Sequence, residues 1–210
     1  MLKKRLIAVL TFNDGVLFRT KNFKADYRYT SNFVDLWSID ELILIDVSKK
    51  KNKINFSEIV KFFSKKCFVP ITAGGGIKKI DDANLFFKSG ADKVLIGSGG
   101  IEDPNLLSNI SKKYGSQSII QSIDCKKSVN TPGEYIIMKD SGVTQVNKKP
   151  TEWLQEALSH GAGEILINSV DNDGSLLGFD LDIVKSFKIY LNSPMLLLGG
   201  CGNWSHMLEL

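Results

Sequence analysis

Small residues follow several apolar stretches of this sequence, and their placement suits the binding of anions. Glycines follow Ile71–Ala73 and Met195–Leu198, Gly97 and Ser98 follow Ala91–Ile96, and Glu164–Ile167 leads into Asp171–Gly174. Glycine at a strand exit lets backbone N–H groups approach an anion, and a helix that starts nearby adds a favourable dipole. Glycine also simply makes turns. Because the pattern recurs, we expect it to line the phosphate-binding rim of a parallel sheet.

The elements that would position these turns alternate along the chain. Apolar runs predict strands, and segments with helical spacing of apolar residues separate them. A small hairpin around Asp140–Gly142 is expected after the fifth strand, and Phe12–Thr20 is expected to be a polar loop. The strands are expected at 6–10, 41–46, 71–77, 93–96, 118–124, 164–168 and 195–198, and the helices at 33–39, 55–65, 81–89, 103–110, 150–160 and 181–187.

This alternation predicts an α/β fold, a (β/α)8 TIM barrel that forms a single domain over residues 1–210. Glu41–Ile45 precedes a glycine run by about thirty residues, and Glu164–Ile167 precedes another by a similar interval. That echo indicates two related half-barrels. A barrel of this type has about 250 residues. We therefore expect the eighth strand and helix to be missing from this sequence, with a further phosphate turn on the missing part.

Composition narrows the function. Twenty-seven basic and 23 acidic residues give a net charge of +4, and the densest basic run, Lys49–Lys51, suits a solvated loop better than a nucleic-acid surface. Three widely spaced cysteines fit free thiols in a reducing cytoplasm. No run of 18 apolar residues predicts a membrane span. The two histidines, His160 and His206, are far apart, so we expect no metal site, and nothing indicates a cofactor.

Several motifs together resemble the cyclase subunit of imidazole glycerol phosphate synthase, the HisF family. They are Lys4-Arg5, Asp40–Asp46, Gly74–Ile77, Gly90–Val94, Ser122–Asp124, Gly161–Ile165 and Asp171–Gly174, and the similarity runs through the whole chain. The resemblance implies a lyase of histidine biosynthesis that works in the cytoplasm without a cofactor. Such an enzyme takes ammonia from a class I glutaminase docked on the N-terminal face of its barrel. It cleaves a phosphorylated ribotide and closes an imidazole ring.

The resemblance also implies roles for individual residues. The family uses two aspartates for proton transfer, and their positions fall on Asp124 and on Thr11. Threonine cannot serve as an anionic base at neutral pH. A carboxylate such as Asp124 could alternatively cap a loop. The phosphate-binding positions fall on Gly76, Gly97 and Ser98 for one half-site and on Asp173, Gly174 and Gly200 for the other.

The opposite rim carries a second set of family positions. Arg5, Glu41, Lys93 and Glu164 match the charged ring that gates ammonia entry, and Asp92 matches a position where the glutaminase docks. Charges of alternating sign at the starts of four strands would pair into a salt-bridged plug. Charged residues on that face also stabilise barrels that carry no ammonia.

Thr11 leaves more than one function open. A divergent branch of the family lacks the first aspartate and supports the amidation of a nucleotide-linked sugar in surface polysaccharide biosynthesis. The loop Gly15–Phe23 looks more like that branch. A barrel that only docks a partner and channels ammonia is a further alternative. A related phosphosugar isomerase is disfavoured, because it too is expected to have the strand-one aspartate.

Overall fold

Seven parallel strands, ordered β1-β5-β6-β7-β8-β11-β12, form the frame of the protein in this computed structural model. The structure describes residues 4–18, 20–21, 24–25, 39–188, 190 and 192–210. These strands span Ile7–Asn13 (β1), Glu41–Asp46 (β5), Ile71–Gly74 (β6), Lys93–Ile96 (β7), Ile119–Lys127 (β8), Glu164–Ser169 (β11) and Met195–Leu198 (β12). The predicted α/β fold is therefore confirmed.

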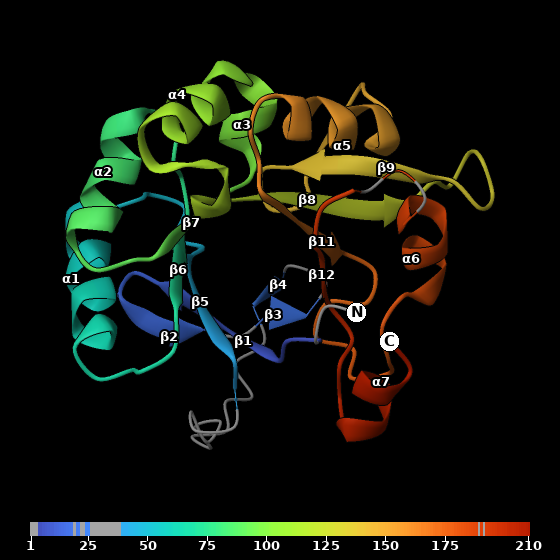
Figure 1. The fold of residues 1–210 in the computed structure, drawn as a ribbon. Coiled ribbons are helices and arrows are strands. Elements are labelled where there is room, and N and C mark those ends of the chain that lie inside the picture. The colour runs from blue at the N-terminus through green and yellow to red at the C-terminus, as the bar shows by residue number, and fades with distance from the viewer. Residues whose placement is uncertain (1–3, 19, 22–23, 26–38, 189, 191) are drawn as a thin grey trace.

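Helices cover the outside of the strands (Figure 1). They span Lys53–Ser64 (α1), Ile80–Lys88 (α2), Ser98–Glu102 (α3), Asn105–Tyr114 (α4), Pro150–Ser159 (α5), Leu181–Lys188 (α6) and Trp204–Leu208 (α7), with a 3₁₀ turn at Ser116–Ser118. Their apolar faces pack on the outward residues of the strands. Phe56 of α1 and Phe86 of α2 meet edge to face, with ring centroids 5.6 Å apart, and Trp153 of α5 is fully buried.

Alternation along each strand divides the core in two. In β5, Leu42 and Leu44 join the large cluster beneath the helices, whereas Ile43 faces the inside of the barrel. Ile43 packs there with Leu95, Ile120 and Leu166, one residue from each of three other strands. Successive strand residues point to opposite faces, so every second residue of these strands faces the interior.

Among the described residues, β12 pairs with β11 alone, and β1 pairs with β5 and with a short strand, β2 (Val16–Phe18). We call the unpaired stretch between Ile7–Leu10 and Met195–Leu198 the seam. The interior residues beside it, Ile7 and Val9 on one flank and Leu196 and Leu198 on the other, are only partly buried. The described strands therefore enclose the interior incompletely along this line. The expectation that the sequence lacks an eighth unit stays a prediction.

Two antiparallel hairpins extend the C-terminal ends of the strands. β2 folds back on β1 through Asp14 and Gly15, both at positive φ, so the prediction of a loop over 12–20 was wrong there. The hairpin predicted around Asp140–Gly142 is confirmed: β9 (Tyr135–Lys139) pairs with β8 and with β10 (Thr144–Val146). A two-stranded pair, β3 (Thr20–Lys21) and β4 (Lys24–Ala25), completes the described strands. The helix predicted at 33–39 falls mostly outside the described residues.

Candidate functional site

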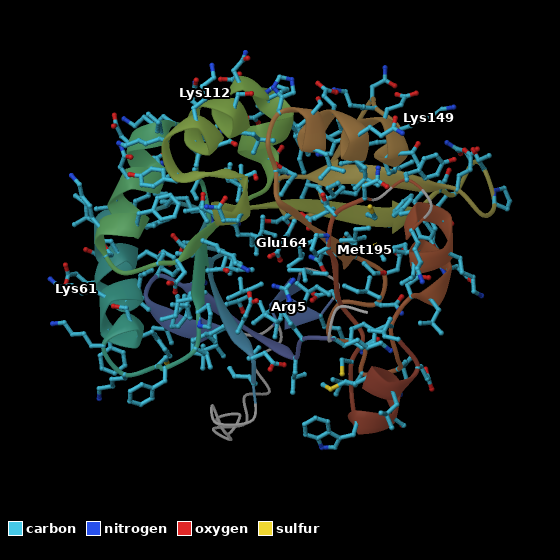
Figure 2. The ribbon with its side chains drawn as sticks, viewed as in Figure 1. Arg5, Lys61, Lys112, Lys149, Glu164 and Met195 are labelled. Atoms are coloured by element: carbon cyan, nitrogen blue, oxygen red, sulfur yellow. The ribbon has the colours of Figure 1, made fainter. Side chains whose placement is uncertain are left out.

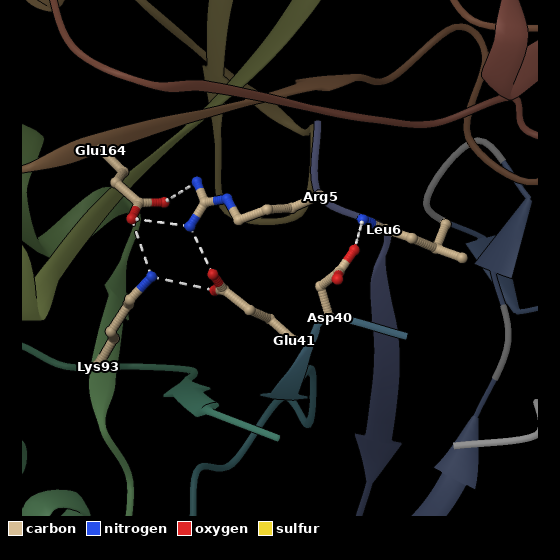
Figure 3. Close-up of polar contacts among 6 residues, drawn as sticks. All are labelled: Arg5, Leu6, Asp40, Glu41, Lys93 and Glu164. Carbon is tan, nitrogen blue, oxygen red and sulfur yellow. Dashed lines mark hydrogen bonds and ion pairs between the residues drawn. The ribbon is translucent and has the colours of Figure 1, made fainter. Parts of the chain in front are cut away.

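Four charged side chains close the N-terminal end of the barrel, and we call them the charged ring: Arg5, Glu41, Lys93 and Glu164. Arg5 donates two hydrogen bonds to Glu164, at 2.8 and 3.2 Å, and a third to Glu41 (Figure 3). Lys93 donates to Glu41 at 3.0 Å and to Glu164 at 2.8 Å. Figure 2 shows Arg5 and Glu164 in the middle of the molecule, whereas Lys61, Lys112 and Lys149 lie at its periphery. Each glutamate therefore has two cationic partners.

The electrostatics of the ring favour its ionised form. Both glutamates are buried, and burial by itself raises the pKa of Glu164, but the hydrogen bonds from Arg5 and Lys93 outweigh it and leave that pKa lowered. The hydrogen bond to Glu164 likewise raises the pKa of Arg5. The side chains of two neighbouring aspartates accept hydrogen bonds from backbone N–H groups. Asp40 accepts from Leu6 N at 2.7 Å, and Asp92 accepts from Ile71 N at 2.7 Å.

At the C-terminal end, Thr11 and Asp124 both face the interior. Thr11 lies two residues beyond Val9, and Asp124 lies four residues beyond Ile120, each on the interior face of its strand. Asp124 accepts a hydrogen bond from Asn168 Nδ2 at 3.1 Å. Burial, with a smaller contribution from the charge of Asp173, raises the pKa of Asp124 to about 6. A carboxyl group with a pKa near neutrality suits proton transfer.

The first group of expected phosphate-binding residues lies at the ends of β6 and β7. Gly76 has a φ of +71°, and a Cβ there would lie 2.8 Å from Lys51 Cγ. Gly97 precedes α3, which begins at Ser98. Gln121, fully buried on β8, donates to the carbonyl of Gly97 at 3.2 Å. The adjoining hollow of about 580 Å³ is lined by Lys50–Ile54, Gly76 and Lys78, so this side of the rim is positively charged.

The second group lies at the ends of β11 and β12. Gly200 has a φ of +97°, and a Cβ there would lie 2.0 Å from the carbonyl oxygen of Gly178, so only glycine fits. Gly178 N donates to the carbonyl of Gly200 at 2.8 Å, and Asn172 Nδ2 donates to the carbonyl of Gly178 at 2.9 Å. These bonds hold the loop with Asp173 and Gly174 against the end of β12. In the strand order, β8 with Asp124 lies between the two groups.

Sequence reasoning missed two polar residues of this region. Gln121 and Asn168 are buried within otherwise apolar strands, and their side chains hold the Gly97 turn and Asp124. The only signal was a polar residue inside an apolar run. Helix α3 was also missed, since Gly99 and Gly100 disfavour a helix. A group of three or more potential metal ligands is absent from the part of the chain that the structure describes.

Comparison with known proteins identifies the family. Residues 8–210 match the family described as "Histidine biosynthesis protein". The chain belongs to the HisF family. A protein of Streptococcus mutans named imidazole glycerol phosphate synthase subunit HisF is 34% identical over 220 residues, which cover all of this chain and 85% of that relative. Its namesake from Chlorobaculum parvum is 36% identical over all of this chain and 84% of its own length.

Some similar members of the HisF family carry hisF2 in their names. One from Parasynechococcus marenigrum, with hisF2 in its name, is 39% identical over all of this chain and 80% of its own length. Because the chain belongs to the HisF family, its seven parallel strands are those of a (β/α)8-type barrel. None of the helices formed by the described residues is long and apolar enough to cross a membrane.

Proposed function

We propose that this chain is a HisF-like cyclase subunit that uses ammonia from a glutaminase on a phosphorylated, ribotide-type substrate. One observation carries the proposal: the charged ring and Asp124 lie at opposite ends of one barrel interior. Glu164 and Asn168 occupy the two ends of the interior face of β11, and Asn168 contacts Asp124. Ammonia admitted through the ring would emerge beside the carboxyl group that transfers protons.

The two groups of phosphate-binding candidates fit a substrate with a phosphate at each end. Gly76, Gly97 and Ser98 would hold one phosphate, and Asp173, Gly174 and Gly200 would take part in holding the other. Because β8 lies between them, the middle of such a substrate would lie over Asp124. A carboxyl group there can act as a general acid or base.

The proposed partner is a class I glutaminase on the N-terminal face, near Asp40 and Asp92. Charged pairs at such an interface affect mainly the rate and orientation of association. Co-purification should recover the glutaminase, and Asp92→Lys should slow complex formation. Asp92→Asn is the matched control, since its carbonyl can still accept from Ile71 N. Unchanged association of Asp92→Lys would exclude this docking position.

Thr11 favours a second candidate function, the passage of ammonia to amidation of a nucleotide-linked sugar, and a barrel that only channels ammonia is a third. An assay of the purified protein with the ribotide and an ammonium salt separates the cyclase function from both alternatives. Loss of one acid–base group costs about 10²–10⁴-fold, so we expect cyclase turnover reduced by that factor relative to a family member with both aspartates. A rate equal to that of such a member would contradict the sugar-amidation alternative. No turnover on the ribotide, with or without the glutaminase, would contradict the cyclase proposal.

A further inference from the structure

Asn168 carries a buried oxygen without a partner. The residue is 8% exposed, its Nδ2 donates to Asp124, and its Oδ1 accepts no hydrogen bond within the described part of the chain. A carboxylate can only accept, so the amide nitrogen must face Asp124 and the amide oxygen must face away. An unpaired buried acceptor costs about 1–3 kcal/mol, and a group retained at such a cost is a candidate for contact with a ligand.

The register places the Asn168 side chain on the face of β11 that points into the barrel interior. Asn168 pairs with Asp124 on one side and with Leu198 on the other. Two residues earlier on the same face of β11 is Leu166, in the interior apolar cluster, and four residues earlier is Glu164, in the charged ring. The Asn168 carboxamide and the Asp124 carboxylate therefore form neighbouring acceptors at the C-terminal end of the interior.

Asp124 also differs from four buried carboxylates of the described residues, Glu41, Glu164, Asp82 and Asp180, which all have a cationic partner. Glu41 and Glu164 each contact Arg5 and Lys93. Asp82 contacts Lys53 and two backbone N–H groups, and Asp180 contacts Lys127 and Tyr135. Asp124 has no cationic partner among the described residues; its hydrogen bond comes from a neutral amide. A partly buried carboxylate of this kind favours a cation or a strong donor beside it.

We propose that Asn168 Oδ1 and the Asp124 carboxylate together bind the nitrogen nucleophile, as ammonia or ammonium. Neighbouring strands lie about 4.8 Å apart, so one small nitrogen with several N–H bonds can donate to both acceptors at once. This inference rests on the proposed function, in which ammonia reaches Asp124. Asn168 is then the residue that holds the incoming nitrogen.

NMR with the full chain tests this directly. Ammonium chloride is titrated at pH 7.5 against potassium chloride at constant ionic strength, while the carboxyl ¹³C of Asp124 and the side-chain amide signals of Asn168 are followed. The signals of both residues should shift saturably and give the same dissociation constant. Tetramethylammonium, which has no N–H group, should produce none. Equal shifts with potassium or tetramethylammonium would overturn the proposal.

Variants separate recognition from a general salt effect. Asn168→Leu removes the acceptor and should weaken ammonium binding at Asp124 about tenfold, the effect of one hydrogen bond of about 1.4 kcal/mol. Asn168→Thr keeps one oxygen and should retain more of the affinity. Asn105→Leu, at an exposed site on α4, is the matched control. If Asn168→Leu does not fold, the comparison of Asn168→Thr with the parent decides, and unchanged affinity in the folded variant overturns the proposal.

The outcome is distinguishable from that of the proposed function. Saturable ammonium binding in a protein that fails to turn over the ribotide would support the ammonium site at Asn168 and Asp124 and contradict the proposed cyclase activity. Turnover with ammonium salts but no saturable shift would support the proposed cyclase activity and contradict the ammonium site at Asn168 and Asp124.

Discussion

At the scale of single residues, Asp124 gives the clearest dependence on pH. Its pKa is raised to about 6 by burial, so the fold disfavours the ionised form. The free energy of unfolding should therefore fall as the pH rises from 4 through 6. In Asp124→Asn this loss should be absent. Relative to the parent, the free energy of unfolding of the variant should therefore rise by about 1–2 kcal/mol between pH 4.5 and pH 7.5, allowing for partial solvent screening.

Urea unfolding at the two pH values measures the difference, and Asp140→Asn serves as the control. Asp140 is exposed at the hairpin tip with a φ of +54°, a conformation that asparagine tolerates. A gain in Asp140→Asn equal to that in Asp124→Asn would show that the effect is not specific to the barrel interior. Ammonia-dependent activity should be lost in Asp124→Asn while the protein stays folded.

At the scale of elements, Gly100 and Gln121 form a matched pair that shapes the Gly97 turn. A Cβ on Gly100 would lie 2.3 Å from Gln121 Oε1. Alanine in a helix is otherwise favoured over glycine by up to about 1 kcal/mol, so the sign of the effect is informative. Gly100→Ala should destabilise by about 1–3 kcal/mol, because the carboxamide of Gln121 must move away from Gly97.

A double-mutant cycle checks this reading. In a Gln121→Ala background, Gly100→Ala should be neutral or stabilising, because the clashing oxygen is gone. Additive effects of the two substitutions on the free energy of unfolding would show that the two side chains are independent. Binding of inorganic phosphate should weaken in both single variants if the Gly97 turn belongs to a phosphate site.

The parts of the fold predicted from sequence are those with a local cause. Apolar runs predicted β5, β7 and β12 at their observed bounds, and the Asp140–Gly142 turn predicted its hairpin. Helix α3 was not predicted, because its glycines are explained by close contacts of Gly99 with the Ile77 carbonyl and of Gly100 with Gln121, and not by local propensity. Asn168 escaped because its direction depends on strand register. The roles of Thr11, Asp124 and the glycine turns came from resemblance and remain predictions.

At the scale of the whole molecule, the charged ring links elements that no backbone ladder joins among the described residues. Arg5 precedes β1 and Glu164 begins β11, which lie on opposite flanks of the seam. Breaking a buried ion pair costs about 3–5 kcal/mol. Arg5→Gln should therefore lower the free energy of unfolding by several kcal/mol. The loss should exceed that in Lys93→Gln, because Arg5 bridges the seam, whereas Lys93 joins β5 and β11, which are each two strands from β7 in the continuous strand order.

Chemical denaturation of both variants measures this order. Lys61→Gln on α1 is the control, since its contact with Glu58 is an exposed i,i+3 pair at 3.7 Å, and such pairs contribute under about 1 kcal/mol. A larger loss in Lys93→Gln than in Arg5→Gln would contradict the assignment of Arg5 as the tie between the flanks.

The seam also has a kinetic consequence for the backbone amides. β7 and β8 have paired neighbours on both sides. Among the described residues, β12 has one paired neighbour, and so does the Ile7–Leu10 part of β1. Deuterium should therefore replace amide hydrogen slowest in β7 and β8, and fastest at Met195–Leu198 and Ile7–Leu10. Mass spectrometry of peptides after timed exposure to D₂O would record this gradient. Uniform protection of all seven strands would mean that the two flanks open and close together, as one cooperative unit.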